Sequence, residues 1–255
     1  SMAIEMINND KENNYLYITP YLDECKRIKE SCQDKHFTEP SNEKLGTKSR
    51  HFKELIKHDR NIVSTHALFK GIDTETRDLL SIKDYVLILD EVMNVVEEVE
   101  ISKQDLKIIL EKYVITNERN EMVWTDPNYT GKYEEYKKMC EEGSLILVRD
   151  TVIMWKFPAE VFKYFKEVYI LTYMFDAQIQ KYYFDYYNLQ YNYKTIDRDD
   201  NNNYIIVEKG QSKFEHEKKI QIKGLVDLYK GKNNNIGKAD NALSKTWFIN
   251  NKDNV

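Results

Sequence analysis

The 255-residue sequence contains few cysteines and no long apolar segment. Its three cysteines, Cys25, Cys32 and Cys140, are odd in number and share no metal-binding spacing. This pattern favours reduced thiols in a cytoplasmic protein over a disulfide framework. The longest apolar runs fall well short of the ~18 residues that a membrane-spanning helix needs, and the acidic N-terminal segment does not resemble a signal peptide. We therefore expect a cytoplasmic protein that does not enter a membrane.

An excess of basic charge is also missing. Lys and Arg total 38 against 43 Asp and Glu, which gives a net charge of −5, so no global field draws the chain to nucleic acid. Nucleic-acid binding would need a local patch, for which residues 48–60 are the best candidate, although they fit an ordinary surface helix equally well. The 19 Tyr, 10 Phe and 3 Trp exclude a chain that is disordered throughout.

Apolar, strand-like segments alternate with helix-like segments over the first two thirds of the chain. The strand-like segments are 15–19, 61–65, 85–89, 145–148, 152–155 and 168–172. Such alternation predicts an α/β fold with a mostly parallel sheet covered by helices on both faces.

From about Thr195 onward the sequence is rich in Asn and turn formers, with short strands expected at 204–208 and 219–224 and a helix near 239–248. We therefore predict one domain over residues 1–194. Residues 195–255 would then be a small irregular extension or the start of a second domain.

The strongest local signal is the segment YVLILDEV at residues 85–92, in which an apolar run ends in Asp90 and Glu91. In parallel sheets, ligands gather at the carboxyl ends of the strands. An Asp at such an end can hold Mg²⁺, and a Glu beside it can orient and deprotonate a water directed at a γ-phosphate. The alternative is a buried strand that meets a solvated loop.

Three other predicted strands also end in polar residues. Thr19 and Pro20 precede a predicted helix, whose free backbone N–H groups could receive a phosphate. Thr172 ends the last strand, in a position to hydrogen-bond toward the acidic pair. After the second strand come four possible donors to a phosphodiester backbone: Ser64, Thr65, His66 and Lys70. Each segment alone also fits an ordinary strand, turn and helix, and no catalytic triad surrounds His66.

Along the chain, these four strand ends come in the order Thr19-Pro20, Ser64-Thr65-His66, Asp90-Glu91 and Thr172. This ordered set resembles the first RecA-like motor domain of superfamily 2 helicases. The chain more closely resembles the DEAD/DEAH-helicase-like proteins of phages and prophages from low-GC Gram-positive bacteria. The matching segments are YITPYLDECKRI (17–28), STHALF (64–69), LILDEV (87–92), YILTYMFDAQ (169–178) and ALSKTWF (242–248).

The resemblance implies a three-layer RecA-like domain that uses ATP and Mg²⁺. Asp90 would hold the metal and Glu91 would be the catalytic residue that activates water. Thr19 and Thr65 would contact the nucleic-acid strand, and Thr172 would couple ATP to strand movement.

The phosphate-binding loop of such a motor is missing from the sequence. A nucleotide motor needs GxxxxGK[ST], whose amides and lysine cradle the phosphates, and none of the eight glycines belongs to such a segment. Most of a second motor domain is also missing. We therefore expect a fragment or a truncated form of a phage-type helicase or translocase, with very slow or no ATP hydrolysis. The alternative is a non-enzymatic module that binds single- or double-stranded nucleic acid or a replication partner.

The aromatic segment 182–193 has two interpretations. Exposed tyrosines could stack single-stranded bases, whereas aromatics on a helix that packs against a sheet usually belong to the core. We expect the core arrangement.

Overall fold

We describe residues 1–225, 246, 247 and 249 of a computed structural model. The chain divides into two compact units, Ser1–Tyr191 and Asn192–Val255. Whether these units act as a motor domain and an extension stays a prediction.

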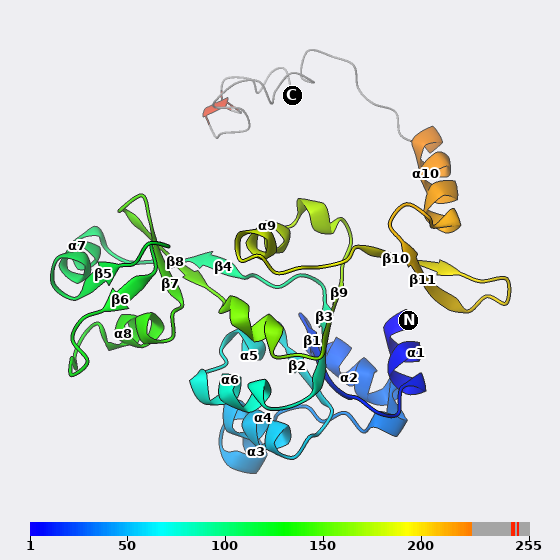
Figure 1. Ribbon diagram of the computed structural model, residues 1–255, viewed down its shortest axis with the longest axis horizontal. Helices are drawn as coiled ribbons and strands as arrows, with labels where there is room; N and C mark the ends of the chain where they lie inside the picture. The colour runs from blue at the N-terminus through cyan, green and yellow to red at the C-terminus, as the bar shows by residue number, and fades with distance from the viewer. Residues whose placement is uncertain (226–245, 248, 250–255) are drawn as a thin grey trace. The chain divides into compact units, whose positions relative to one another are not determined.

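Four parallel strands form the central sheet of the first unit (Figure 1). They are β1 (Asn14–Thr19), β2 (Ile62–Thr65), β3 (Tyr85–Asp90) and β9 (Glu167–Leu171), in the order β2-β1-β3-β9. Since all four run in one direction, their carboxyl ends meet at one edge, where Thr19 pairs with Thr65 and Asp90 pairs with Leu171. The mixed α/β fold and this parallel sheet confirm part of the sequence expectation, while the RecA-like three-layer arrangement stays a prediction.

Helices α1 (Met2–Asn9) and α2 (Leu22–Ser31) pack against one face of the sheet. Their buried residues form one cluster with alternate residues of the strands, such as Tyr15 and Tyr17 of β1 and Ile88 of β3. Along each strand, successive side chains point to opposite faces, so Leu16, Ile18 and Leu87 are buried on the other face. The segment from β1 to β2 also contains η1 (Gln33–Lys35) and the short helix α3 (Asn42–Leu45).

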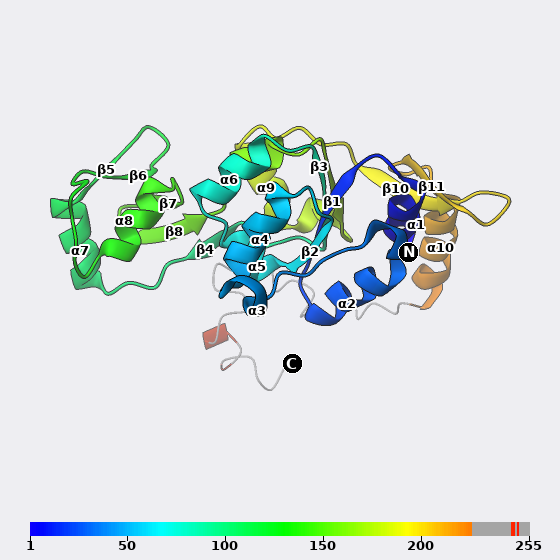
Figure 2. The ribbon, with the colours of Figure 1, turned by 90° about the horizontal axis from the view of Figure 1, so that it is seen from below.

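Three further helices follow: α4 (Lys48–Lys57), α5 (His66–Lys70) and α6 (Thr74–Ser81). Figure 2 shows them grouped near β2. Helix α4 begins directly after Thr47, whose side chain accepts a hydrogen bond from the Arg50 N–H and caps the helix.

An inserted lobe separates β3 from β9. Its elements are β4 (Val96–Glu98), α7 (Lys103–Lys112), β5 (Val114–Thr116), β6 (Met122–Trp124), α8 (Glu134–Glu141), β7 (Leu145–Val148) and β8 (Val152–Lys156). Strands β4, β8 and β7 form one antiparallel sheet, and β5 pairs with β6. The strands expected at 145–148 and 152–155 are present, but they form an antiparallel hairpin outside the parallel sheet. Only three residues connect them, whereas a parallel crossover needs a dozen or more.

The lobe has its own apolar core, to which Ile109, Met122 and Leu145 contribute. Within it the rings of Tyr113 and Trp124 stack with centroids 5.2 Å apart. The chain returns through η2 (Ala159–Lys163) to β9, then through η3 (Phe175–Ala177) to α9 (Ile179–Tyr186). Both η2 and η3 are short 3₁₀ turns, and the α-helix of this part of the chain begins only at Ile179.

The described part of the second unit is a β-hairpin followed by a helix. Strands β10 (Lys194–Arg198) and β11 (Tyr204–Glu208) are antiparallel, and α10 spans Lys213–Leu225. The strand predicted at 219–224 is wrong, because these residues lie inside α10, where the backbone satisfies its own hydrogen bonds without a neighbouring strand. The expected helix near 239–248 and the ALSKTWF segment lie outside the described residues, apart from Thr246 and Trp247.

Candidate functional site

The acidic pair lies at the carboxyl edge of the central sheet. Asp90 is the last residue of β3, and Glu91 follows it. The Glu91 N–H donates to the carbonyl oxygen of Leu171 at 2.9 Å, which extends the pairing with β9 by one step. Glu91 has φ 68°, in the left-handed region, which costs a side-chain-bearing residue about 1–2 kcal/mol. The surrounding sheet therefore holds Glu91 in a strained conformation that turns the chain sharply.

Thr172 reaches the acidic pair from the neighbouring strand. Its hydroxyl Oγ1 donates to Glu91 Oε2 at 2.9 Å. The sequence predicted a hydrogen bond from Thr172 toward the acidic pair, and this bond is present. The role of Thr172 in coupling ATP to movement stays a prediction.

Asp90 is half-buried between charged and polar neighbours. Burial raises the pKa of its carboxyl, and this outweighs the hydrogen bond from the Tyr17 hydroxyl, which favours the ionised form. Glu24 and Arg27 of α2 also act on it, and they form an ion pair with each other at 2.6 Å. The sequence analysis missed Tyr17, although alternation along β1 puts it on the same sheet face as Thr19.

Two of the predicted nucleic-acid contacts are inaccessible. Thr19 is fully buried and Ser64 is 3% exposed. Among the described residues, no partner contacts Thr19 Oγ1. A phosphodiester would reach these hydroxyls only if the sheet edge opened. Pro20 and Thr65, in contrast, are partly exposed, and Thr65 stands directly before α5.

His66 and Lys70 of α5 also have surroundings that the sequence did not show. Burial lowers the pKa of His66, although a hydrogen bond to the backbone of Asp90 acts in the opposite direction. Lys70 Nζ lies 2.5 Å from Glu97 Oε1 and 4.8 Å from the centre of the Trp155 ring. Lys70 therefore links α5 to the inserted lobe, and a phosphate would have to compete with Glu97 for it.

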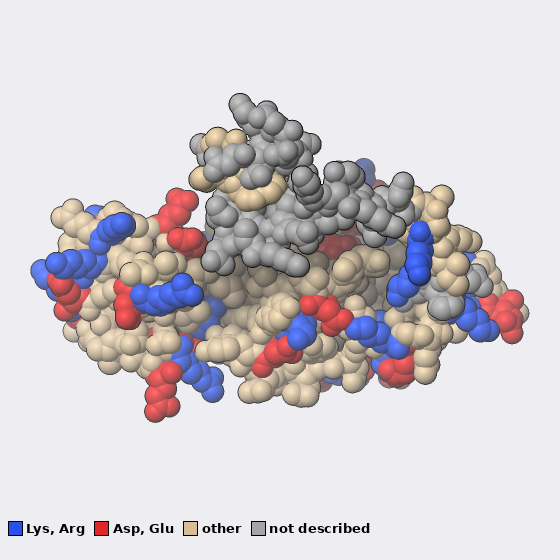
Figure 3. All heavy atoms as spheres, turned by 90° about the horizontal axis from the view of Figure 1, so that it is seen from above, with Lys and Arg blue, Asp and Glu red and all other residues tan. Residues whose placement is uncertain are grey.

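Acidic neighbours partly neutralise the basic segment 48–60. Lys53 pairs with both Asp73 and Glu75, at 2.7 and 2.5 Å. Figure 3 shows Lys and Arg side chains interspersed with Asp and Glu over the visible described surface.

The prediction that the aromatic residues of segment 182–193 belong to the core is only half correct. Tyr183 and Phe184 of α9 are buried, whereas Tyr182 and Tyr186 are 62% and 63% exposed.

A cation at this edge would need water or substrate phosphates to complete its set of ligands. In the part of the chain that the structure describes, no three His, Cys, Asp or Glu side chains are grouped to hold a metal. Mg²⁺ commonly takes one or two carboxylates and completes its shell with water and substrate phosphates. Asp90 fits this role as a single protein ligand.

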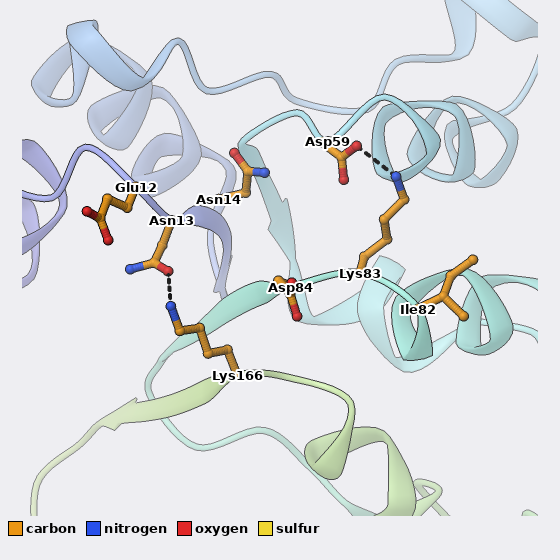
Figure 4. Close-up of a pocket in the computed structure, with 8 residues that line it drawn as sticks. All are labelled: Glu12, Asn13, Asn14, Asp59, Ile82, Lys83, Asp84 and Lys166. Atoms are coloured by element: carbon orange, nitrogen blue, oxygen red, sulfur yellow. Dashed lines mark hydrogen bonds and ion pairs between the residues drawn. The ribbon is translucent and has the colours of Figure 1, made fainter.

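A hollow lies at the opposite, amino edge of the sheet, away from the acidic pair (Figure 4). It has a volume of about 490 Å³ and is lined by Glu12, Asn13, Asn14, Asp59, Ile82, Lys83, Asp84 and Lys166. Lys83 pairs with Asp59, and Lys166 donates to Asn13 Oδ1, each at 2.7 Å. Both lysines are thus engaged in holding the strand beginnings together. We place the candidate site at the acidic pair, where ligands of parallel sheets gather.

Within the described residues, no helix combines the length and the apolar character needed to cross a membrane. All three cysteines are buried and free.

The fold and the site define an α/β protein with an acidic pair at a parallel sheet edge and an antiparallel lobe inserted directly after that pair. Residues 96–155, which form this lobe, match the family model of the YonV middle domain. The chain is 38% identical over 257 residues to the SPbeta prophage-derived uncharacterized protein YonV of Bacillus subtilis (strain 168). No solved structure matches the chain.

The chain is therefore a homologue of a prophage-derived protein, which supports the phage or prophage origin predicted from the sequence. The similarity covers 96% of the chain and 62% of the length of this relative. Neither comparison indicates a helicase, and that part of the resemblance stays a prediction.

Proposed function

We propose that the carboxyl edge of the central sheet is part of a Mg²⁺–nucleotide site of a phage-type nucleic-acid helicase or translocase. The observation that carries this proposal is the hydrogen bond from Thr172 to Glu91 beside Asp90. It joins the ends of two adjacent parallel strands through one carboxylate. Glu91 is exposed, and the bond from Thr172 uses only its Oε2, which leaves Oε1 to orient a water.

Asp90 would hold Mg²⁺ together with nucleotide phosphates and water, and the ion would neutralise charge on the phosphates. Without GxxxxGK[ST], the chain lacks the amides and lysine that would bind the rest of the triphosphate. Removal of a single such donor typically costs about 10²–10³-fold in rate. We therefore expect weak nucleotide binding and very slow or no hydrolysis by this chain.

The test measures Mg²⁺-dependent binding and hydrolysis of ATP by the full chain. Asp90→Asn should abolish the Mg²⁺ dependence of binding. The matched control is Asp84→Asn, at the other end of the same strand, which should bind like the wild type. Hydrolysis at ordinary enzyme rates of about 1–10³ s⁻¹, lost in Glu91→Gln, would contradict the expected inactivity. Binding that is insensitive to Asp90→Asn would contradict the site.

A second candidate function is binding of single-stranded nucleic acid without catalysis. The exposed rings of Tyr182 and Tyr186 on α9 favour it, because exposed aromatic rings stack on unpaired bases for about 1–3 kcal/mol each. Filter binding at two salt concentrations should show a salt-sensitive affinity that falls in the Tyr182→Ala, Tyr186→Ala double variant. Exposed Tyr204, on β11, supplies the control Tyr204→Ala. An equal loss of nucleic-acid affinity in the α9 double variant and in Tyr204→Ala would contradict a site on α9.

A further inference from the structure

The turn that carries the acidic pair continues into two connecting segments that are attached to helix α9. The outgoing segment runs from Glu91 to Val95, and the returning segment contains Phe157. The Phe157 N–H donates to the Val95 carbonyl oxygen at 2.8 Å, so the two segments lie side by side between the sheet and the inserted lobe. Both residues are fully buried.

Helix α9 contacts both connecting segments. Gln180, only 1% exposed, accepts a buried hydrogen bond from the Met93 N–H at 3.1 Å between its Oε1 and that nitrogen. One helical turn later, the Tyr183 hydroxyl donates to the Phe157 carbonyl oxygen. Near the end of α9, the Lys156 ammonium lies 5.3 Å from the centre of the Tyr187 ring. The connection to the lobe is thus fixed to α9 along the length of the helix.

Gln180 is an uncommon choice for this position. The neighbouring buried residues of α9, Tyr183 and Phe184, are aromatic, whereas Gln180 places a polar amide in the interior. Among the described residues, its Nε2 has no hydrogen-bond partner, which is unfavourable for a buried amide. Among the described residues only the oxygen of this amide is hydrogen-bonded, and it binds a backbone N–H two residues after Glu91.

We propose that Gln180 is a positioning residue for the acidic pair: by holding the Met93 N–H, it maintains the strained turn at Glu91. The turn is then fixed on both sides, by Leu171 and Thr172 at Glu91 and by Gln180 at Met93. A left-handed glutamate persists only where its surroundings constrain it, so loss of one constraint should release the turn. Movement of α9 or of the inserted lobe would thereby reach the acidic pair. The importance of this positioning for nucleotide binding rests on the proposed function, but the positioning itself does not.

Amide hydrogen exchange of the full chain, resolved at Glu91 and Met93, tests this inference. Gln180→Met keeps the size of the side chain but removes the acceptor. Exchange at Met93 should accelerate roughly tenfold or more because its buried hydrogen bond is lost. The decisive amide is Glu91, which Gln180 does not touch. If Gln180 positions the turn, exchange at Glu91 should also accelerate, while Leu87 in the middle of β3 should remain protected.

Phe184→Leu is the matched control, since it weakens the packing of α9 without altering the acceptor for Met93. At an equal loss in urea midpoint, it should leave Glu91 and Met93 protected. Acceleration at Met93 alone in Gln180→Met would reduce Gln180 to a local hydrogen-bond partner and overturn the proposal, as would the same acceleration in Phe184→Leu. Mg²⁺–ATP binding by the wild type is measured in parallel. If that binding is absent while Glu91 responds to Gln180→Met, the proposed function fails and the positioning role stands.

Discussion

Glu91 combines a strained backbone with a side chain that a neighbouring strand holds in place. A glycine would satisfy the left-handed φ of 68° without a steric penalty. The glutamate therefore lowers the stability of the fold at this position, a pattern that is concentrated at functional sites.

We expect Glu91→Gly to leave the free energy of unfolding within about 0.5 kcal/mol of the wild type, because relief of the strain offsets both the backbone entropy that glycine adds to the unfolded chain and the lost hydrogen bond from Thr172. Urea denaturation measures the change. Glu91→Gln retains the Cβ and an acceptor for Thr172, and it should have nearly wild-type stability. A glycine variant less stable than the glutamine variant by about 1 kcal/mol or more would show that the turn is not strained, since that is the combined cost of the glycine entropy and the lost hydrogen bond.

Thr172→Val should remove the hydrogen bond to Glu91 while keeping the shape of the side chain. At this solvent-accessible position we expect a loss of about 0.5 kcal/mol in the free energy of unfolding, near the lower limit for a hydrogen bond. Thr172→Ser retains the hydroxyl and serves as the control. Equal unfolding midpoints for the valine variant and the wild type would indicate that the hydrogen bond contributes nothing to stability.

Among the helices, α6 has the best-defined N-terminal cap. The Asp73 side chain accepts hydrogen bonds from both the N–H and the hydroxyl of Thr76, and it pairs with Lys53 at 2.7 Å. Burial would raise the pKa of Asp73, but the hydrogen bonds from Lys53 and Thr76 together outweigh it and lower the pKa to about 2. The ionised carboxylate thus stabilises the start of α6, as expected for an acidic cap at a helix N-terminus.

Because the pKa of Asp73 is lower in the folded than in the unfolded chain, its contribution to stability is present above about pH 4 and is lost as the pH falls toward 2. Asp73→Asn keeps a capping oxygen but removes the charge. Its urea midpoint should lie below that of the wild type at pH 7, and the two should converge near pH 2. Asp78→Asn, on the exposed side of α6, is the control. The same pH dependence in that variant would contradict an effect specific to the cap.

The first unit buries apolar residues on both faces of the central sheet and, separately, inside the inserted lobe. Leu87 of the sheet and Leu145 of the lobe are fully buried, so Leu→Ala at either position should cost about 2–5 kcal/mol. Trp124 and Trp155 both lie in the lobe and report its unfolding by fluorescence.

If the cores unfold separately, Leu145→Ala should lower the midpoint of the tryptophan transition more than that of the helical circular-dichroism transition, and Leu87→Ala should do the reverse. Coincident transitions in both variants would show instead that the lobe and the sheet unfold as one cooperative unit.

Local sequence patterns were sufficient to predict the four core strands and the polar residues at their ends. Apolar runs such as 85–89 can be buried on both sides only in the interior of a sheet, and Asp90, Glu91 and Thr172 each follow such a run. The pairing of Asp90 with Leu171 depended in addition on the order of the strands, which places β9 beside β3.

Only the tertiary structure decided which residues surround the acidic pair. Tyr17 and Arg27 reach Asp90 from other elements, Gln180 reaches Met93 from 87 positions away, and Lys70 pairs with Glu97 across the lobe boundary. Periodicity identifies the buried face of an element but not the element that covers it, because such contacts depend on how distant segments pack. For the same reason the sequence predicted the strands at 145–148 and 152–155 but not the separate lobe that they build.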